Sequence, residues 1–482
     1  MSKEKVKILE KRVVHYNDDD QMVSAHLMPL HKSASLSLLT EPDRITISSG
    51  EARNARKEQK GDEPSKRLDI TGFKHLLMLI LVVGNIKMLF ADFYSFGVWD
   101  TLNHFGFGKD DLRMGFLISL SNFLYTPMAL GIEVSASTKT HSLLRKYVGA
   151  LHTTVAFTAL IYGSILTWQN VQHPLVATAC EANVIVTFLK LVSFALTNKE
   201  LRQGVENKLP LPKFYENGPI YPQNLTLGNI FYFWFAPTLI YQPIYPKRSR
   251  VRWKRVFSLL AELVMATVLF WVLMMQMAIP ALSHFFENQE SFPTMVEDYL
   301  SLCTIDMCLW LIGFFVLFQV ALNLVAEVTR FGDRTFYQDW WNASSVGTFW
   351  RDWNLPVSNF FRRHLYTPLR ANGCPKQIAA NLVFLASAVL HELLFGIATH
   401  NFNGVAFMCM IVQPIFILAT QPLENERGKG STIGNCVMWV SMMLGQPTAV
   451  ILYYEQWIGR NETMRTPTEW RYWIPSFHPT RK

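Results

Sequence analysis

Several features of soluble proteins are scarce in this sequence. Charged residues make up 17% of the 482 residues, against the roughly 25% of soluble domains, while half are hydrophobic. The six cysteines form no CxxC pair, which argues against a zinc site or a disulfide framework. The 45 Lys and Arg residues are spread along the chain, so the net charge of +8 forms no single patch for nucleic acid. The composition therefore favours a membrane protein.

The first 70 residues contain no apolar run long enough for the core of a signal peptide. They hold 13 basic and 12 acidic side chains, and the segment from Asp43 to Arg67 has few aromatic residues. Such a segment cannot bury enough apolar surface to offset the entropy of ordering. We therefore expect residues 1–71 to form a disordered cytosolic arm.

Apolar stretches of about 20 residues, the length that crosses a bilayer core, recur from residue 74 onward. The fourth stretch contains Glu181 and Lys190, and the eighth contains Pro414. The sequence predicts an all-α polytopic membrane protein in which residues 72–457 form the transmembrane domain and 458–482 a lumenal tail. Nine spans are predicted, at residues 75–96, 114–132, 148–168, 174–197, 257–279, 305–328, 377–397, 404–420 and 433–455.

The distribution of Lys and Arg between the loops predicts the orientation of these spans. With a cytosolic N-terminus, the loops on the cytosolic side hold 22 basic residues and the opposite loops hold two, Lys109 and Arg113. Basic residues are retained on the cytosolic side during insertion. Nine spans then place the C-terminus in the lumen, where the sequon at Asn461 could be glycosylated.

Two segments of the cytosolic loops are unusually aromatic. Residues 228–243 are too short to span a bilayer, and residues 336–366 mix four tryptophans with arginines. Aromatic rings concentrate at the headgroup level of membranes. We therefore predict amphipathic interfacial helices here, with lipid anchoring as one explanation of the composition.

Polar residues inside the predicted spans are costly to insert and therefore informative. In the sixth span Gln319, Asn323 and Glu327 share one helical face. They either line a cavity or hydrogen-bond to neighbouring helices. The eighth and ninth spans each contain a glutamine before a proline, Gln413 and Gln446, which either project into a common polar chamber or mark kinks.

His391 lies well inside the seventh span, with Ser387 one turn before it on the same face. Imidazole can take up and return a proton near neutral pH, which makes histidine the usual general base. A structural histidine bonded to another helix fits the sequence equally well. A Ser-His-Glu triad does not fit, because Glu392 is adjacent to His391 and points about 100° round the helix.

The segment Phe336-Tyr337-Gln338-Asp339-Trp340-Trp341-Asn342 resembles the FYxDWWN signature of the membrane-bound O-acyltransferases that esterify sterols and diacylglycerol. His391-Glu392 follows at the distance expected of that family. Flanking segments at 331–334, 353–357 and 221–225 are more similar to members that act on diacylglycerol than to those that act on sterols. The resemblance extends from about residue 72 to 457.

The resemblance implies that His391 is the catalytic base of a reaction chamber enclosed by the transmembrane helices. It implies that Asn354, Gln413 and Gln446 surround the histidine and the reacting carbonyl, and that Glu392 and Ser387 line the chamber. Tyr366 and Lys376 would lie near the cytosolic entrance for CoA, where Ser358 and Ala380 depart from the family's histidine and arginine. Acyl-CoA recognition is implied for Phe336, Tyr337, Asp339, Trp340, Trp341, Asn342 and Trp353.

The expected activity is transfer of an acyl group from acyl-CoA, the co-substrate, to the free hydroxyl of diacylglycerol, forming triacylglycerol. No cofactor or metal is expected, because a thioester is already activated. The family further implies the endoplasmic reticulum membrane, contacts with membrane lipids, and a homodimer or homotetramer. Three alternatives remain open: a sterol or long-chain alcohol acceptor, a transporter, and a lipid-binding protein without catalysis. The acyl-chain preference is not predicted by the sequence.

Overall fold

The computed structural model describes residues 10–16, 22–29, 109–138, 142–207, 219–287, 291–424 and 429–464. Within these residues, eight helices are long and apolar enough to cross a membrane. They coincide with eight of the predicted spans, including the fourth, which carries Glu181 and Lys190. The helices cover Asp110–Ser137, Arg145–Asn170, Pro174–Glu206, Trp253–Phe286, Phe292–Val328, Lys376–Ala398, Val405–Leu423 and Thr432–Tyr453.

The predicted span at 75–96 lies outside the described residues, as do most of the predicted arm and the tail beyond residue 464. Within the arm, however, strand β1 (Glu10–Tyr16) pairs antiparallel with strand β2 (Met22–Pro29). The two strands are the described part of residues 1–71, and a disordered cytosolic arm stays a prediction for the rest. Val13, Val14 and Tyr16 have side chains that favour extended backbone, which the average composition of residues 1–71 conceals.

Several of the membrane helices are made of shorter pieces. The span at 253–286 consists of α9 (Trp253–Leu273), the π-turn η2 (Met274–Ala278) and α10 (Ile279–Glu287). The span at 292–328 is similarly divided into α11 (Phe292–Phe314), the π-turn η3 (Phe315–Ala321) and α12 (Leu322–Val328). The remaining membrane helices are α4 (Lys109–Phe123), α5 (Tyr125–Ser137), α6 (Ser142–Asn170), α7 (Pro174–Glu206), α16 (Lys376–Ala398), α17 (Val405–Ile411), α18 (Gln413–Thr420) and α19 (Lys429–Met464).

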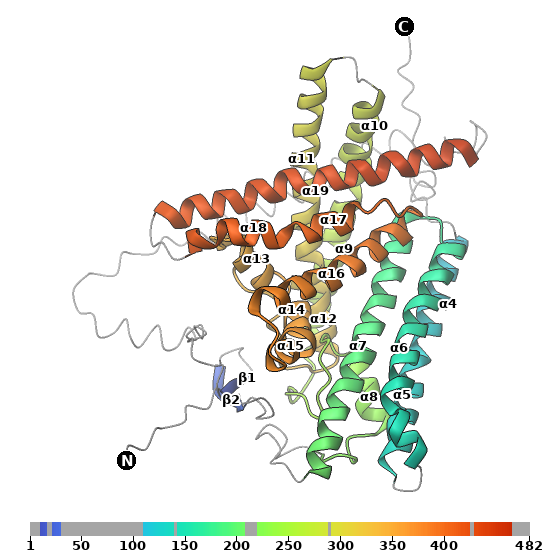
Figure 1. Ribbon diagram of the computed structural model, residues 1–482. Coiled ribbons are helices and arrows are strands. Elements are labelled where there is room, and N and C mark those ends of the chain that lie inside the picture. Colours follow the sequence, from blue (N-terminus) through green and yellow to red (C-terminus); the bar gives the residue numbers. More distant parts are fainter. Residues whose placement is uncertain are drawn as a thin grey trace. The chain divides into compact units, whose positions relative to one another are not determined.

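The helices pack in two sequential groups that α7 and α16 connect. Helix α7 contacts α4, α5 and α6 on one side and α16 on the other, while α17 contacts both α16 and α19 (Figure 1). Helix α11 packs against α19. The helix that carries His391 is therefore flanked by segments that are far apart in the sequence.

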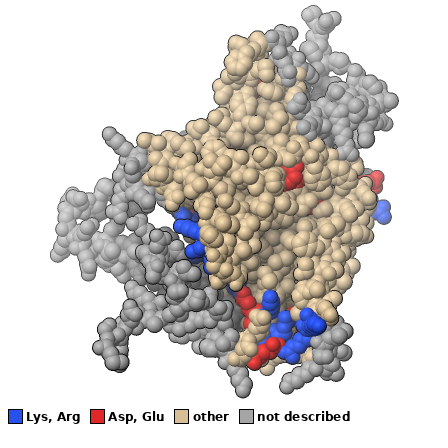
Figure 2. All heavy atoms as spheres, viewed as in Figure 1, with Lys and Arg blue, Asp and Glu red and all other residues tan. Residues whose placement is uncertain are grey.

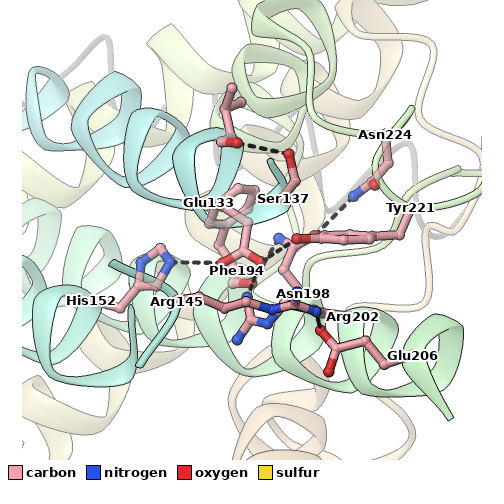
Figure 3. A network of polar contacts seen from close by, with 11 residues as sticks. Glu133, Ser137, Arg145, His152, Phe194, Asn198, Arg202, Glu206, Tyr221 and Asn224 are labelled. Atoms are coloured by element: carbon pink, nitrogen blue, oxygen red, sulfur yellow. Dashed lines mark hydrogen bonds and ion pairs between the residues drawn. The ribbon is translucent and has the colours of Figure 1, made fainter. Parts of the chain in front are cut away.

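A buried carboxylate ties three of these helices together (Figure 3). Glu133 of α5 is fully buried and contacts His152 Nε2 of α6 at 3.0 Å, and it forms an ion pair with Arg202 of α7. Tyr221 Oη donates to the same carboxylate at 3.0 Å. Burial and the nearby glutamate raise the pKa of Tyr221 to about 12, which keeps this donor protonated. Glu133 thus joins α5, α6, α7 and the loop that contains Tyr221.

The face shown in Figure 2 carries few charged side chains over the helices, and many of its charges gather at the lower edge. Figure 1 places the end of α5, the start of α6 and the end of α7 there. Large apolar side chains are exposed along the spans, as at Phe116, Phe157 and Val264. Such an apolar belt suits contact with lipid rather than water. The protein is a multi-pass membrane protein.

The aromatic segment at 336–366 is more deeply packed than an interfacial position predicts. Trp340 is 1% exposed and sits among Trp310 of α11, Phe349, and Trp439 of α19. An amphipathic pattern does not distinguish a lipid surface from a protein surface. The segment folds into η4 (Trp340–Asn342), α13 (Val346–Asp352), α14 (Leu355–Phe361), the π-turn η5 (Arg362–Tyr366) and α15 (Thr367–Ala371).

The earlier aromatic segment contains helix α8 (Leu227–Phe235), whose C-terminal end is capped from a membrane helix. The ammonium group of Lys190 on α7 donates to the carbonyl oxygens of Phe233, Trp234 and Ala236 at 2.7–2.9 Å. Carbonyl groups at a helix end lack partners within the helix, and a cation there complements the helix dipole. Lys190, a costly residue within a membrane helix, therefore holds the C-terminal end of α8 against α7.

Candidate active site

His391 lies on α16, and its imidazole is oriented by the preceding turn. Nδ1 lies 2.8 Å from the carbonyl oxygen of Ser387 and 3.3 Å from Ser387 Oγ. A carbonyl oxygen can only accept, so the shorter contact assigns the proton to Nδ1 and the lone pair to Nε2. Ser387 thus acts on His391 mainly through its backbone. The arrangement suits a general base that uses Nε2.

Glu392 points away from this imidazole, as the residue spacing predicts. Its Oε1 accepts from the backbone N–H of Gly404 at 2.8 Å, and its Oε2 accepts from Phe407 at 3.0 Å. Tyr453 Oη of α19 also donates to Oε2 at 3.1 Å. The carboxylate therefore connects α16 to α17 and α19 and orients neither His391 nor Ser387.

Gln413, the first residue of α18, is oriented by a tryptophan. Trp350 Nε1 donates to Gln413 Oε1 at 3.0 Å, and Gln413 Nε2 donates to the Cys409 carbonyl oxygen at 2.9 Å. Trp350 in turn meets Phe384 of α16 edge to face, with centroids 5.9 Å apart. Phe384 precedes His391 by two helical turns and shares its face. The second N–H of the Gln413 amide could still serve a reacting group.

The other two predicted amides have different surroundings. Asn354 is the N-cap of α14, and its Oδ1 accepts from the backbone N–H of Val357 at 3.2 Å. Gln446 lies on α19 directly before Pro447, and its buried Oε1 has no hydrogen-bond partner within the described residues. A buried polar atom without a partner is costly and marks a place where a ligand or water can bind.

The residues of the FYxDWWN segment divide into buried and exposed positions. Phe336 and Trp340 are buried, whereas Asp339, Trp341 and Asn342 are exposed. Tyr337 Oη donates to Gln319 Oε1 of η3 at 2.7 Å, and Trp353 stacks on Phe349. Part of the signature therefore holds this segment on α11 and α19. The role of the exposed part in acyl-CoA recognition stays a prediction.

The polar stripe of the sixth span is used for contacts within the protein. Gln319 accepts from Tyr337, and Asn323 Nδ2 donates to the carbonyl oxygen of Gln319 at 3.0 Å. Glu327 is fully buried and pairs with Arg252 at 3.1 Å and Arg334 at 2.6 Å. The stripe was predicted either to line a cavity or to hydrogen-bond to neighbouring helices. The contacts of Gln319 and Glu327 fit the second interpretation.

The residues predicted near the CoA entrance lie at the start of α16 and just before it. Lys376 is exposed at the first turn of α16, and Tyr366 ends the π-turn η5. Ser358, which stands where the family has histidine, donates from Oγ to the Arg351 carbonyl oxygen at 3.0 Å. Ala380 lies one turn after Lys376 on the same helix. Their role towards CoA stays a prediction.

Two residues that orient the candidate site were missed in the sequence. Trp350 was grouped with the aromatic residues of the interface, although it orients Gln413. Tyr453 was not singled out, although it bonds to Glu392. Its spacing of seven residues from Gln446 places both on one face of α19 and could have indicated it. Trp350 has no comparable spacing signal, because its partner lies in another helix.

The fold, the position of the histidine and the sequence agree on one class of protein. A sequence model of the membrane-bound O-acyltransferase family matches residues 106–454. The chain belongs to this family of acyltransferase enzymes, which confirms the resemblance carried by the FYxDWWN segment and His391.

Among its relatives, the chain is 31% identical to diacylglycerol O-acyltransferase 1 of Dictyostelium discoideum over 81% of this chain. That alignment spans 63% of the relative, less than two thirds of its length. Diacylglycerol O-acyltransferase 1A of Glycine max is 32% identical over 81% of this chain and 78% of the relative. Diacylglycerol O-acyltransferase 1 of Bos taurus is 37% identical over 57% of this chain and 58% of the relative.

Proposed function

We propose that this protein transfers an acyl group from acyl-CoA to the free hydroxyl of diacylglycerol, forming triacylglycerol, with His391 as general base. The orientation of the imidazole carries the proposal. Nδ1 is held on the Ser387 carbonyl oxygen, so Nε2 has the lone pair that a base requires. The names of the relatives support diacylglycerol as the acceptor.

In the proposed reaction, His391 Nε2 removes the proton of the lipid hydroxyl as its oxygen attacks the thioester carbonyl. A carbon–oxygen bond forms and the carbon–sulfur bond breaks. The leaving CoA thiolate takes the proton from the imidazolium, so that no proton is gained or lost. Amide N–H groups of Gln413, Gln446 or Asn354 stabilise the oxyanion, each by about 2.7–4 kcal/mol in a pre-organised site.

The proposed setting follows from the solubility of the two substrates. Acyl-CoA approaches from the cytosol past Tyr366 and Lys376, and diacylglycerol enters sideways from the bilayer. The reaction needs no further cofactor or metal. The proposal includes the endoplasmic reticulum membrane, a cytosolic N-terminus, a lumenal C-terminus and a homodimer or homotetramer.

The test uses purified protein in nanodiscs with labelled oleoyl-CoA and diacylglycerol, cholesterol or a long-chain alcohol in parallel. We expect label in triacylglycerol and none with His391→Ala, because loss of the base removes proton transfer and the group that holds the hydroxyl. His284→Ala is the matched control, since His284 is exposed and its Nδ1 lies 3.0 Å from Asp298 Oδ2, away from α16.

The outcomes separate the parts of the proposal. Label in a sterol ester or wax ester would retain the chemistry and overturn the acceptor. Normal activity of a folded His391→Ala variant would overturn the base. No ester that depends on CoA with any alcohol would overturn the activity.

A further inference from the structure

The first turn of α17 is capped by side chains from three different segments. The four N–H groups at the start of a helix lack acceptors within that helix. Here Gly404 and Phe407 donate to the two carboxylate oxygens of Glu392, at 2.8 and 3.0 Å. Val405 donates to Asn403 Oδ1 at 2.9 Å, and Ala406 donates to Tyr453 Oη at 3.2 Å. All four donors are thus satisfied.

The cap is a closed network between α16, α17 and α19. Tyr453 Oη donates to Glu392 Oε2 and accepts from the Ala406 N–H, so the hydroxyl serves the cap both as donor and as acceptor. Its ring is 6% exposed and packs against Phe395 of α16, with centroids 6.0 Å apart. The left-handed backbone of Gly404, at φ 75°, places its N–H at the start of the helix, and glycine adopts this conformation without strain.

Each helix of the network carries one of the groups proposed for the reaction or leads directly to it. Helix α16 carries His391 beside Glu392. Helix α17 leads to Gln413, whose amide bonds back to the Cys409 carbonyl oxygen. On α19, Gln446 lies two turns before Tyr453 on the same face. A displacement at the cap would therefore move both glutamines relative to the histidine.

We propose that Glu392 and Tyr453 are positioning residues that fix Gln413 and Gln446 relative to His391. The proposal rests on the proposed function, because it assigns the two glutamines to stabilisation of the reacting carbonyl. The carboxylate of Glu392 and the hydroxyl of Tyr453 are both used by the cap, and the proposal assigns neither a contact with substrate. Their effect is on the geometry of the transition state and not on the binding of acyl-CoA.

The test compares Glu392→Gln, Tyr453→Phe and the double variant with the full-length wild type in nanodiscs. Turnover is followed as release of the CoA thiol. Misplacement by about 1 Å can cost about a hundredfold in rate, so we expect kcat to fall about a hundredfold for Glu392→Gln and about tenfold for Tyr453→Phe. KM for acyl-CoA should change less than about twofold. The double variant should match Glu392→Gln, because groups that act as a unit are not additive.

Tyr245→Phe is the matched control, because Tyr245 is also buried and its hydroxyl also accepts from one group, the Gln242 N–H at 2.9 Å, and donates to another, the Ile240 carbonyl oxygen at 3.2 Å. Tyr245 lies outside the cap and on none of its three helices, so kcat of this variant should stay within about twofold of wild type. Hydrogen exchange gives a second measurement that needs no substrate. The amides of 404–407 should exchange faster in both cap variants and at the wild-type rate in Tyr245→Phe.

Several outcomes would overturn the proposal. One is faster exchange at 404–407 with unchanged kcat, and another is a rise in KM in place of a fall in kcat. A loss of kcat in Tyr245→Phe equal to that in Tyr453→Phe would mean that removal of any buried tyrosine hydroxyl has this effect. Diacylglycerol, cholesterol and a long-chain alcohol are each offered to the wild type, which shows the acceptor that the enzyme uses. The kcat of each variant is then measured with that acceptor, so an error in the proposed acceptor does not affect the test of the cap. A wild type that releases no CoA with any alcohol would overturn the proposed function, and this proposal with it.

Discussion

At the scale of single residues, Trp350 is the clearest test of how the candidate site is oriented. Its indole N–H donates to Gln413 Oε1, and phenylalanine would keep most of the ring contact with Phe384. We expect Trp350→Phe to lower kcat about tenfold, because a mispositioned amide loses part of an oxyanion contact. Trp253→Phe, at an exposed apolar position of α9, should not change turnover. Equal rates in both variants would contradict this role.

His364 gives a prediction for the dependence of stability on pH. Its Nε2 contacts Ser193 Oγ at 2.8 Å, and burial, with a smaller effect of Arg363, lowers its pKa to about 3. In the unfolded chain the imidazole has a pKa of about 6.5, so it takes up a proton below that pH. The buried imidazole of the folded protein stays neutral, so the folded protein loses stability as the pH falls below about 6.5. At pH 5 the loss is about 2 kcal/mol.

The measurement is the Tm of the wild type and of His364→Gln at several pH values between 5 and 7.5. The Tm of the wild type should fall across this range, and that of His364→Gln should fall less, because the substituted side chain does not titrate. Parallel curves for the two proteins would show that other groups cause the dependence.

At the scale of elements, the sequence predicted the membrane helices well and their internal breaks poorly. Runs of about 20 apolar residues require a helix in lipid, so eight predicted spans match helices in the described residues. The π-turns at 274–278 and 315–321 carry no such signal. His391 could be predicted because histidine is rare in a span. Tyr453 could be predicted only from its spacing of seven residues from Gln446 on α19. Trp350 could not be predicted, because contacts between helices depend on packing that periodicity does not encode.

The cap on α8 provides a prediction at this scale. Lys190→Met keeps the apolar stem and leaves three carbonyl groups without their shared donor. We expect a loss of about 1–3 kcal/mol, the usual cost of unsatisfied buried groups, seen as a lower Tm in detergent. Lys199→Met on the same helix is the control, since Lys199 is exposed and should leave Tm unchanged. An unchanged Tm for Lys190→Met would show that α8 is held by its apolar contacts alone.

At the scale of the whole molecule, Glu133 tests how the helices are held together. The carboxylate joins α5, α6, α7 and Tyr221, and Glu133→Ala would leave the buried Arg202 without this partner. Breaking a buried pair in this way costs about 3–5 kcal/mol. We expect a sharp fall in the yield of monodisperse protein, measured by size-exclusion chromatography.

Glu206→Ala is the matched control, because Glu206 pairs with Arg145 at an exposed position. Exposed pairs contribute at most about 1 kcal/mol, so the yield should stay near that of the wild type. A normal yield of Glu133→Ala would mean that apolar packing alone holds α5, α6 and α7 together.

The cap of α17 also sets an order for biosynthesis. Tyr453 is made 61 residues after Glu392, so a ribosome finishes α16 and α17 well before the last capping group exists. Until α19 arrives, the Ala406 N–H lacks the tyrosine hydroxyl to which it donates. The surroundings of His391 are therefore completed only when α19 is inserted, and a chain that stops short of Tyr453 contains His391 and Glu392 without the finished cap.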